Sequence, residues 1–207
     1  MTDWMPAAPD RDQLPDSDRA LFDAVQEREM RKYGRLGTYF GGLLNAPAFA
    51  QAVSHLGHVM RGAENQGFYS NADRELIDMV LAVEMDQAGV FAGHLPDAVA
   101  YGVRPAAIAA VCARDDDALT ERERILVDYI RAVYAGQTTE HMFQSVAGEL
   151  GGPRIAVAYT VAIAYLIFTF RMLSAFGIGR GPADGSLADP YVNGTAEVVQ
   201  PPAGRAS

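Results

Sequence analysis

His94 is the residue of this chain best suited to acid–base chemistry, because imidazole moves protons near neutral pH. Its neighbours in the segment GVFAGHLP are apolar or small. A polar side chain in such surroundings is either a hydrogen-bonded core residue or part of a functional site. We consider Glu75 as its partner. Glu75 stands in the first turn of an expected helix, where it either complements the helix dipole or orients His94 and relays its proton.

The elements that would position these two residues are predicted within residues 70–107. Ser70 followed by Asp73 is typical of a helix-starting capping box, and an apolar stripe at helical spacing follows over residues 76–83. A single helix from this cap to Tyr101 would be about 45 Å long, which a domain of this size rarely contains.

A break is therefore expected at Asp86 and Gly89, residues that favour a turn and a new helix start. This predicts two helices, over residues 71–85 and 87–101, that fold back on each other. The carboxylate and the imidazole could then meet only across the break, and only if the two helices are antiparallel.

The bulk composition restricts the class of partner. The chain has 207 residues, 49% of them hydrophobic, which suits one domain with a proper core. Its formal net charge is −9 and it has no run of Lys and Arg. This argues against nucleic acid or an anionic membrane as the main partner.

No metal or cofactor is expected. Cys112 is the only cysteine, so neither an intrachain disulfide nor a cysteine cluster for zinc is possible, and we interpret Cys112 as an inert buried thiol. His55 and His58 lie three residues apart on a predicted helix and could present two metal ligands, but no third ligand is evident nearby.

The N-terminal residues and the most apolar segment indicate where in the cell the protein is expected. The N-terminal residues are acidic and lack the basic-then-apolar order of a signal peptide. The longest uncharged run, Ile155 to Phe170, has 16 residues, fewer than the roughly 20 that a membrane-spanning helix needs. We interpret it as a buried core helix and expect a cytoplasmic protein.

The chain is predicted to be all-α, with an N-terminal arm at residues 1–16, one helical domain at 17–178 and a C-terminal tail at 179–207 rich in Gly, Pro, Ala and Asp. No segment is convincing as a strand. Helices are expected over residues 18–33, 47–64, 71–85, 87–101, 105–113, 121–135, 140–149 and 153–176, with a short one within 34–46. Thr120 and Glu123 form a second capping box.

A motif in this chain resembles the core motif of the carboxymuconolactone decarboxylase and AhpD-like alkylhydroperoxidase family. In this chain the motif consists of Arg74-Glu75-Leu76, His94 with Pro96 and Ala98, then Gly102 and Ile108. The resemblance covers about residues 17–178. It implies an AhpD-like all-α domain of about seven or eight helices, a pocket shared by the glutamate and the histidine, and assembly as a homo-oligomer, a trimer or a hexamer.

The chain departs from the pattern of both branches of that family. In the peroxidase branch two cysteines stand seven and four residues before the histidine, where this chain has Gln87 and Val90. An amide cannot form a thiolate or a disulfide, and valine is inert. Many decarboxylase-like members have a glutamate at the second position, often followed by tryptophan, where this chain has Val90 and Phe91.

The resemblance, with these departures, implies a non-redox enzyme that resembles carboxymuconolactone decarboxylase and acts on a small organic acid or lactone. His94 is the expected general acid or base and Glu75 its partner. Four residues are expected to contact substrate: Gln87, Val90, Phe91 and Arg171. Arg171, a lone charge in the last long helix, either satisfies helix-end carbonyls or binds a substrate carboxylate.

Two alternatives follow from the same residues. Peroxide reduction is the activity of the other branch, and the missing cysteine pair argues against it. A non-catalytic binding or assembly protein is the third hypothesis, since His94 and Glu75 both have structural explanations. A ligand-sized pocket containing His94 would favour the enzyme over the binding protein.

Overall fold

The computed structural model describes residues 4–63 and 66–182, and it divides the chain into two compact units. The first, the N-terminal unit, comprises residues 1–61 with 175–178, and the second, the site unit, comprises residues 62–174 with 179–207. The helical domain predicted at 17–178 therefore falls in both units. Most of the predicted tail, residues 183–207, lies outside the described residues.

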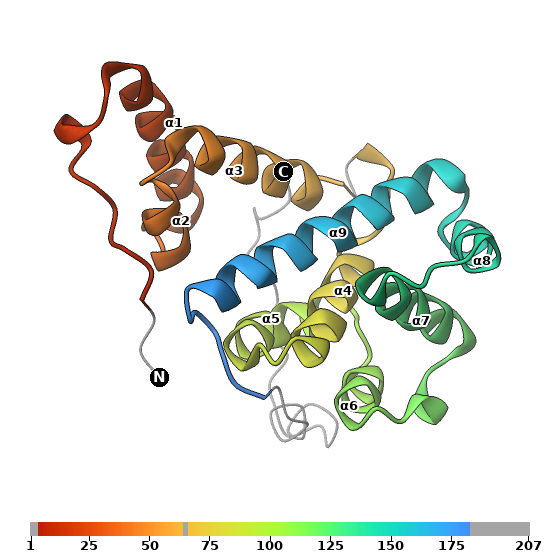
Figure 1. Ribbon diagram of the computed structural model, residues 1–207. Coiled ribbons are helices and arrows are strands. Elements are labelled where there is room, and N and C mark those ends of the chain that lie inside the picture. The colour runs from red at the N-terminus through yellow and green to blue at the C-terminus, as the bar shows by residue number, and fades with distance from the viewer. Residues whose placement is uncertain (1–3, 64–65, 183–207) are drawn as a thin grey trace. The chain divides into compact units, whose positions relative to one another are not determined.

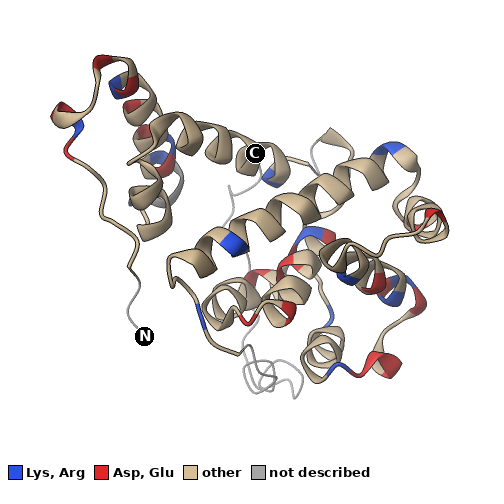
Figure 2. Ribbon diagram, in the orientation of Figure 1, with Lys and Arg blue, Asp and Glu red and all other residues tan. Residues whose placement is uncertain are grey.

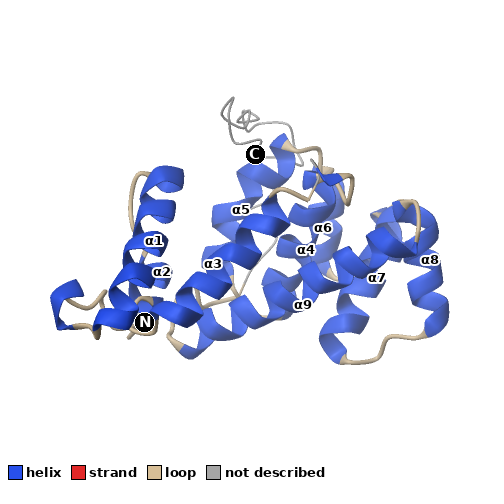
Figure 3. Cartoon of the chain, turned by 90° about the horizontal axis from the view of Figure 1, so that it is seen from above, coloured by secondary structure: helices blue, strands red, loops and turns tan. Residues whose placement is uncertain are grey.

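The all-α prediction is confirmed, and Figure 3 shows no strand in the part of the chain that the structure describes. That part contains nine α-helices, against the seven or eight expected, because the short α2 is counted among them. The helices are α1 (Asp16–Tyr33), α2 (Thr38–Leu43), α3 (Pro47–Arg61), α4 (Asn71–Glu84), α5 (Ala88–Ala100), α6 (Pro105–Ala113), α7 (Glu121–Ala135), α8 (Glu140–Leu150) and α9 (Pro153–Ala175).

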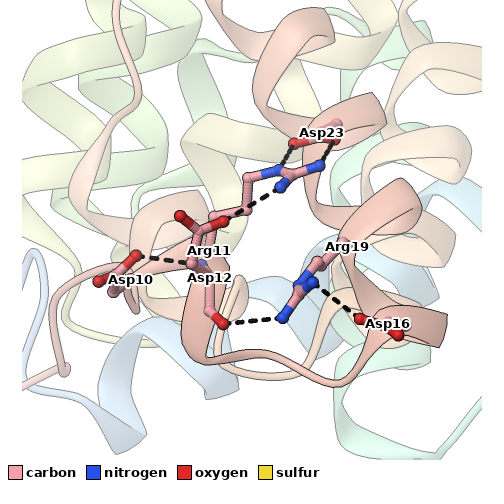
Figure 4. Close-up of polar contacts among 6 residues, drawn as sticks. All are labelled: Asp10, Arg11, Asp12, Asp16, Arg19 and Asp23. Atoms are coloured by element: carbon pink, nitrogen blue, oxygen red, sulfur yellow. Dashed lines mark hydrogen bonds and ion pairs between the residues drawn. The ribbon is translucent and has the colours of Figure 1, made fainter.

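The N-terminal unit is built from α1, α2 and α3, and the predicted arm is tied to it. Arg11, in a short 3₁₀ helix, donates two hydrogen bonds to the carboxylate of Asp23 on α1 (Figure 4). The indole nitrogen of Trp4 donates to the carbonyl oxygen of Ala175 at 2.9 Å. The backbone amide of Trp4 donates to the carbonyl oxygen of Phe176 at 3.0 Å. The arm is therefore an ordered part of this unit from Trp4 onward.

The site unit is organised around α4, which packs against α5, α6 and α7 (Figure 1). All of residues 73–83 are buried, including four charged side chains. The capping box predicted for this helix is present: the hydroxyl of Ser70 accepts from the amide of Asp73 at 3.1 Å, and the Asp73 carboxylate accepts from the amide of Ser70 at 3.2 Å. Charged groups this deep in a core require partners within it.

The predicted break between α4 and α5 is also present. Asp86 has φ of 52°, a left-handed conformation that a helix cannot continue through. The chain reverses there and α5 packs back along α4. The second turn of α4, which carries Glu75, and the middle of α5, which carries His94, are thereby brought together.

The last helix, α9, is buried on one side only, so the prediction of a buried core helix is right for one face. Tyr159 donates to the carbonyl oxygen of Asp73 on α4, and Thr160 shares a hydrogen bond with Tyr129 on α7. Apart from Arg154 and Arg171 the helix is uncharged (Figure 2). Among the described helices it alone is long and apolar enough to cross a membrane by length and composition, and 33% of its most apolar stretch is buried.

Candidate functional site

The centre of the candidate site is a contact between His94 on α5 and Glu75 on α4. The His94 Nδ1 and the Glu75 Oε2 lie 2.9 Å apart, so the contact expected across the helix break is present. The Glu75 side chain is 1% exposed and the His94 side chain is 35% exposed. Because Nδ1 is engaged with the carboxylate, Nε2 is the ring nitrogen left to exchange a proton with a ligand.

Two further charged residues of α4 complete the cluster, and neither was expected there. The Asp78 Oδ2 lies 3.6 Å from the His94 Nδ1 and 3.6 Å from the Arg74 Nη1, while the Arg74 Nη2 pairs with the Glu75 Oε1. Arg74 and Asp78 are one helical turn apart, so both side chains lie on one face of α4. With His94 protonated, the cluster holds two positive and two negative charges.

This arrangement favours the imidazolium form of His94. Burial is the largest single influence on the pKa of His94 and lowers it, but the charge of Asp78, with the hydrogen bond and the charge of Glu75, outweighs burial, and the pKa rises from 6.5 to about 9. Solvent at the exposed part of the ring also stabilises the charge. At neutral pH His94 is therefore a proton donor held ready by two carboxylates.

Glu75 is held as a carboxylate by the same contacts. Burial would raise the pKa of Glu75, but the hydrogen bond and charge of His94, with the charge of Arg74, hold that pKa below its usual range. Nearby, burial raises the pKa of Tyr69 to about 12, so its hydroxyl stays neutral and able to donate. Tyr69 is 4% exposed and its ring packs edge-on against Tyr159.

The donor set of Glu75, Asp78 and His94 also has the spacing of a metal site, since one ligand atom from each lies within 4.8 Å of the others. The guanidinium of Arg74 lies against both carboxylates, however, and supplies the positive charge that a divalent cation would bring. A cation added at this point would be repelled by the guanidinium. The cluster thus suits a proton better than a metal ion.

Three of the expected substrate-contacting residues lie at the start of α5. Gln87 is 1% exposed, and its Nε2 donates to the hydroxyl of Ser174 at 2.6 Å. Val90 is partly buried and lies one helical turn before His94, on the same face of α5. Phe91 is fully buried, so it is a core residue of the site unit.

The fourth residue, Arg171, lies elsewhere in the site unit. Its guanidinium stands over the ring of Tyr134 on α7, 5.6 Å from the centroid, and donates to the Tyr134 hydroxyl at 3.3 Å. Tyr134 lines a cavity of about 370 Å³ at the C-terminal ends of α4, α6 and α7, together with Glu84, Arg114, Arg131 and Ala135. Glu84 is nine residues beyond Glu75, about 14 Å along α4, which separates Arg171 from the His94 cluster.

The remaining candidates form no site. His55 and His58 are exposed on α3 and belong to no group of three possible metal ligands in the described residues. Cys112 lies in α6 and is only partly buried, so it is less enclosed than expected. Asp78 is the functional candidate that sequence analysis missed. Its signal was an acidic residue inside the apolar run LIDMVL, one turn after Glu75.

The comparisons with known proteins bear on the fold. No protein-family model matches the sequence, and no curated protein does. The structure is similar to the crystal structure of an alkylhydroperoxidase AhpD core, an uncharacterized peroxidase-related protein from Ralstonia eutropha JMP134. The TM-score is 0.62 at 19% identity, over 86% of this chain and 97% of that one. The chain therefore has the AhpD-like all-α fold. At this identity the likeness shows the fold and not the reaction.

Proposed function

We propose that the protein is a non-redox enzyme that uses His94 as a general acid on a small organic acid or lactone. The observation that carries this proposal is the 2.9 Å contact between His94 and the buried Glu75, made by a ring that is still one-third exposed. A histidine with a purely structural role in a core would normally be enclosed. Here one nitrogen is fixed and the other is left to a ligand.

Decarboxylation beside a carbonyl illustrates chemistry that the cluster can perform. The bond between the carboxylate carbon and its neighbour breaks, carbon dioxide leaves, and the electron pair stays on the substrate as an enolate. The imidazolium of His94 then gives its proton to carbon. Glu75 and Asp78 stabilise the charged donor before transfer, and solvent restores the proton afterwards. In hydrolytic opening of a lactone, water would add to the carbonyl carbon and lose its extra proton to solvent, and the same donor would protonate the departing ring oxygen.

The two other functions considered above have less support. The positions of the cysteine pair hold Gln87 and Val90, and neither can carry a thiol reaction. The words "peroxidase-related" describe the similar crystal structure from Ralstonia eutropha JMP134 and not this chain. A binding protein without chemistry has no observation of its own in its favour, because it could use the same partly exposed imidazole only to hold a ligand.

Carbon dioxide release and ultraviolet absorbance over a panel of lactones and β-keto acids test the proposal. The native chain is compared with His94→Ala and with Cys112→Ser as a matched control. We expect turnover that falls at least a hundredfold in His94→Ala and is unchanged in Cys112→Ser. Turnover that survives His94→Ala would show that the site is wrong. Binding of panel compounds without turnover would support the binding protein.

A further inference from the structure

The start of α5 is covered by a short stretch of the chain from beyond α9. Residues 179–181, which we term the strap, make three backbone hydrogen bonds there. The amide of Ala88 donates to the carbonyl oxygen of Gly181 at 3.0 Å, and the amide of Gly89 donates to the carbonyl oxygen of Gly179 at 3.0 Å. In the other direction, the amide of Gly181 donates to the carbonyl oxygen of Asp86 at 3.1 Å. The side chain of Arg180 donates to the carbonyl oxygen of Ser174. The predicted tail therefore begins as an ordered part of the site unit.

The strap fits because both sides of the contact are glycine. A Cβ on Gly89 would lie 2.8 Å from the Cα of Gly179, which is closer than real side chains approach backbone. Gly181 has φ of +127°, a conformation open only to glycine. A methyl group on Gly89 would therefore displace the strap, and a side chain at Gly181 would strain the strap backbone.

The strap carbonyls occupy the place where a helix binds an anion. The first amides of α5 have no partner within the helix, and the N-cap residue Gln87 provides no side-chain cap. Such amides, together with the helix dipole, bind carboxylates and phosphates. Here the amides of Ala88 and Gly89 are satisfied only by strap carbonyls.

A second observation at this position points to a ligand. Gln87 is 1% exposed, and its Oε1 faces the strap, 3.1 Å from where a Cβ of Gly179 would stand, with no hydrogen-bond partner. A buried amide atom without a partner destabilises the state that contains it. The closed strap therefore leaves a polar group that a ligand could satisfy.

We propose that the start of α5 is a binding site for the carboxylate of a 2-hydroxy acid, and that the strap closes this site until a ligand displaces it. The carboxylate would accept from the amides of Ala88 and Gly89, and the hydroxyl would donate to the Gln87 Oε1. Val90 and His94 follow on one face of α5, and His94 lies about 8 Å along the helix axis from the amides of Ala88 and Gly89. An alkyl chain of four to five carbons would therefore extend from the bound carboxylate towards the imidazole. The class of ligand rests on the proposed function above.

Two glycine variants release the strap in different ways, and each has a matched control. Gly89→Ala pushes the strap away with a methyl group, while Gly93→Ala makes the same change one turn later on α5, where nothing lies within 4 Å. Gly181→Ala strains the strap backbone without adding atoms to α5. Gly102→Ala imposes the same kind of strain, at φ of +99° and in open space, at the other end of α5.

Amide hydrogen exchange of residues 88 and 89 in the full chain measures strap release, and binding of 2-hydroxyhexanoate measured by NMR shifts of the same amides tests the site. We expect exchange about tenfold faster in Gly89→Ala and Gly181→Ala than in their controls, because only the strap protects these amides. We expect 2-hydroxyhexanoate to bind about tenfold more tightly to Gly181→Ala than to the native chain or Gly102→Ala, and 1-hexanol, which has no carboxylate, to show no such gain.

Unchanged exchange in both strap variants would overturn the closure, and faster exchange without tighter binding would overturn the carboxylate site. Failure of the proposed function has a different signature. In that case no compound is turned over in a His94-dependent manner, yet 2-hydroxyhexanoate still binds more tightly once the strap is released. Tighter binding of the 2-hydroxy acid than of hexanoate is also expected, and equal binding would remove the assigned role of Gln87.

Discussion

At the scale of single residues, the site depends on how two carboxylates share one imidazole. Glu75 supplies the short contact at 2.9 Å, and Asp78 adds its charge from 3.6 Å. Resemblance to a known motif predicted the first of these contacts but not the second. A charge within an apolar stripe looks locally like an exception to the pattern. Only the packing of α5 on α4 shows that it faces a histidine.

Replacing Asp78 by Asn tests this division of roles. We expect the pKa of His94 to fall from about 9 towards 6.5, because the charge of Asp78 is the largest effect that raises it. An NMR titration of the His94 ring protons measures the shift. Asp117→Asn makes the same change of net charge at an exposed residue of a short 3₁₀ helix and serves as the control. A titration midpoint that is equal in the two variants would contradict the role given to Asp78.

The raised pKa of His94 also predicts how stability varies with pH. The folded pKa of about 9 lies above the ordinary value of 6.5, so the charged ring contributes stability that is fully present below pH 6.5 and is lost as the pH rises through 9. Relative to His94→Gln, the native chain should lose on the order of 1 kcal/mol across that window, an amount reduced by solvent at the exposed ring.

Urea unfolding at pH 6, 7, 8 and 9.5 measures this difference. His141→Gln removes an exposed imidazole at the start of α8 and is the matched control. If the native chain and His94→Gln lose stability in parallel as the pH rises, the charged cluster does not hold the proton as described.

At the scale of helices, most of the fold could be predicted because its signals are local. The capping boxes before α4 and α7 are present as expected, and the break at Asp86 separates α4 from α5. These features depend on neighbours a few residues apart. The strap could not be predicted in this way. Its glycines indicate a flexible tail, and only contacts with α5, about 90 residues earlier in the chain, give it a fixed place.

Ser70→Ala tests how far the site depends on the start of its helix. Loss of the cap on α4 should reduce the free energy of unfolding by about 1 kcal/mol, since an amide and a carboxylate lose their partner. Thr120→Ala removes the equivalent cap from α7 and should cost a similar amount. Urea unfolding measures both. Only Ser70→Ala should also shift the His94 titration, because Glu75 lies in the following turn. A shift of equal size in both would indicate a general loosening.

At the scale of the whole molecule, the structure has two compact units. The boundary is set by which helices contact each other far along the chain, and composition does not change sharply there. The partial exposure of α9 could not be predicted from composition either. An uncharged run of this length fits a fully enclosed helix as well as a helix with one open face. On that face Val157, Val161 and Phe168 are 54%, 48% and 45% exposed.

We predict that the exposed side of α9 is covered by neighbouring subunits in the expected trimer or hexamer. A row of large apolar side chains is more often covered by a partner than left in water. Light scattering should give about 67 kDa or about 134 kDa rather than the 22.3 kDa of one chain. Val161→Glu should lower that mass while the circular dichroism stays helical, because a charge is tolerated at a half-exposed position but not within an apolar interface. Gln144→Glu adds the same charge on α8 and should leave the mass unchanged. A native chain that scatters as a monomer at millimolar concentration would show that α9 faces solvent in the working protein.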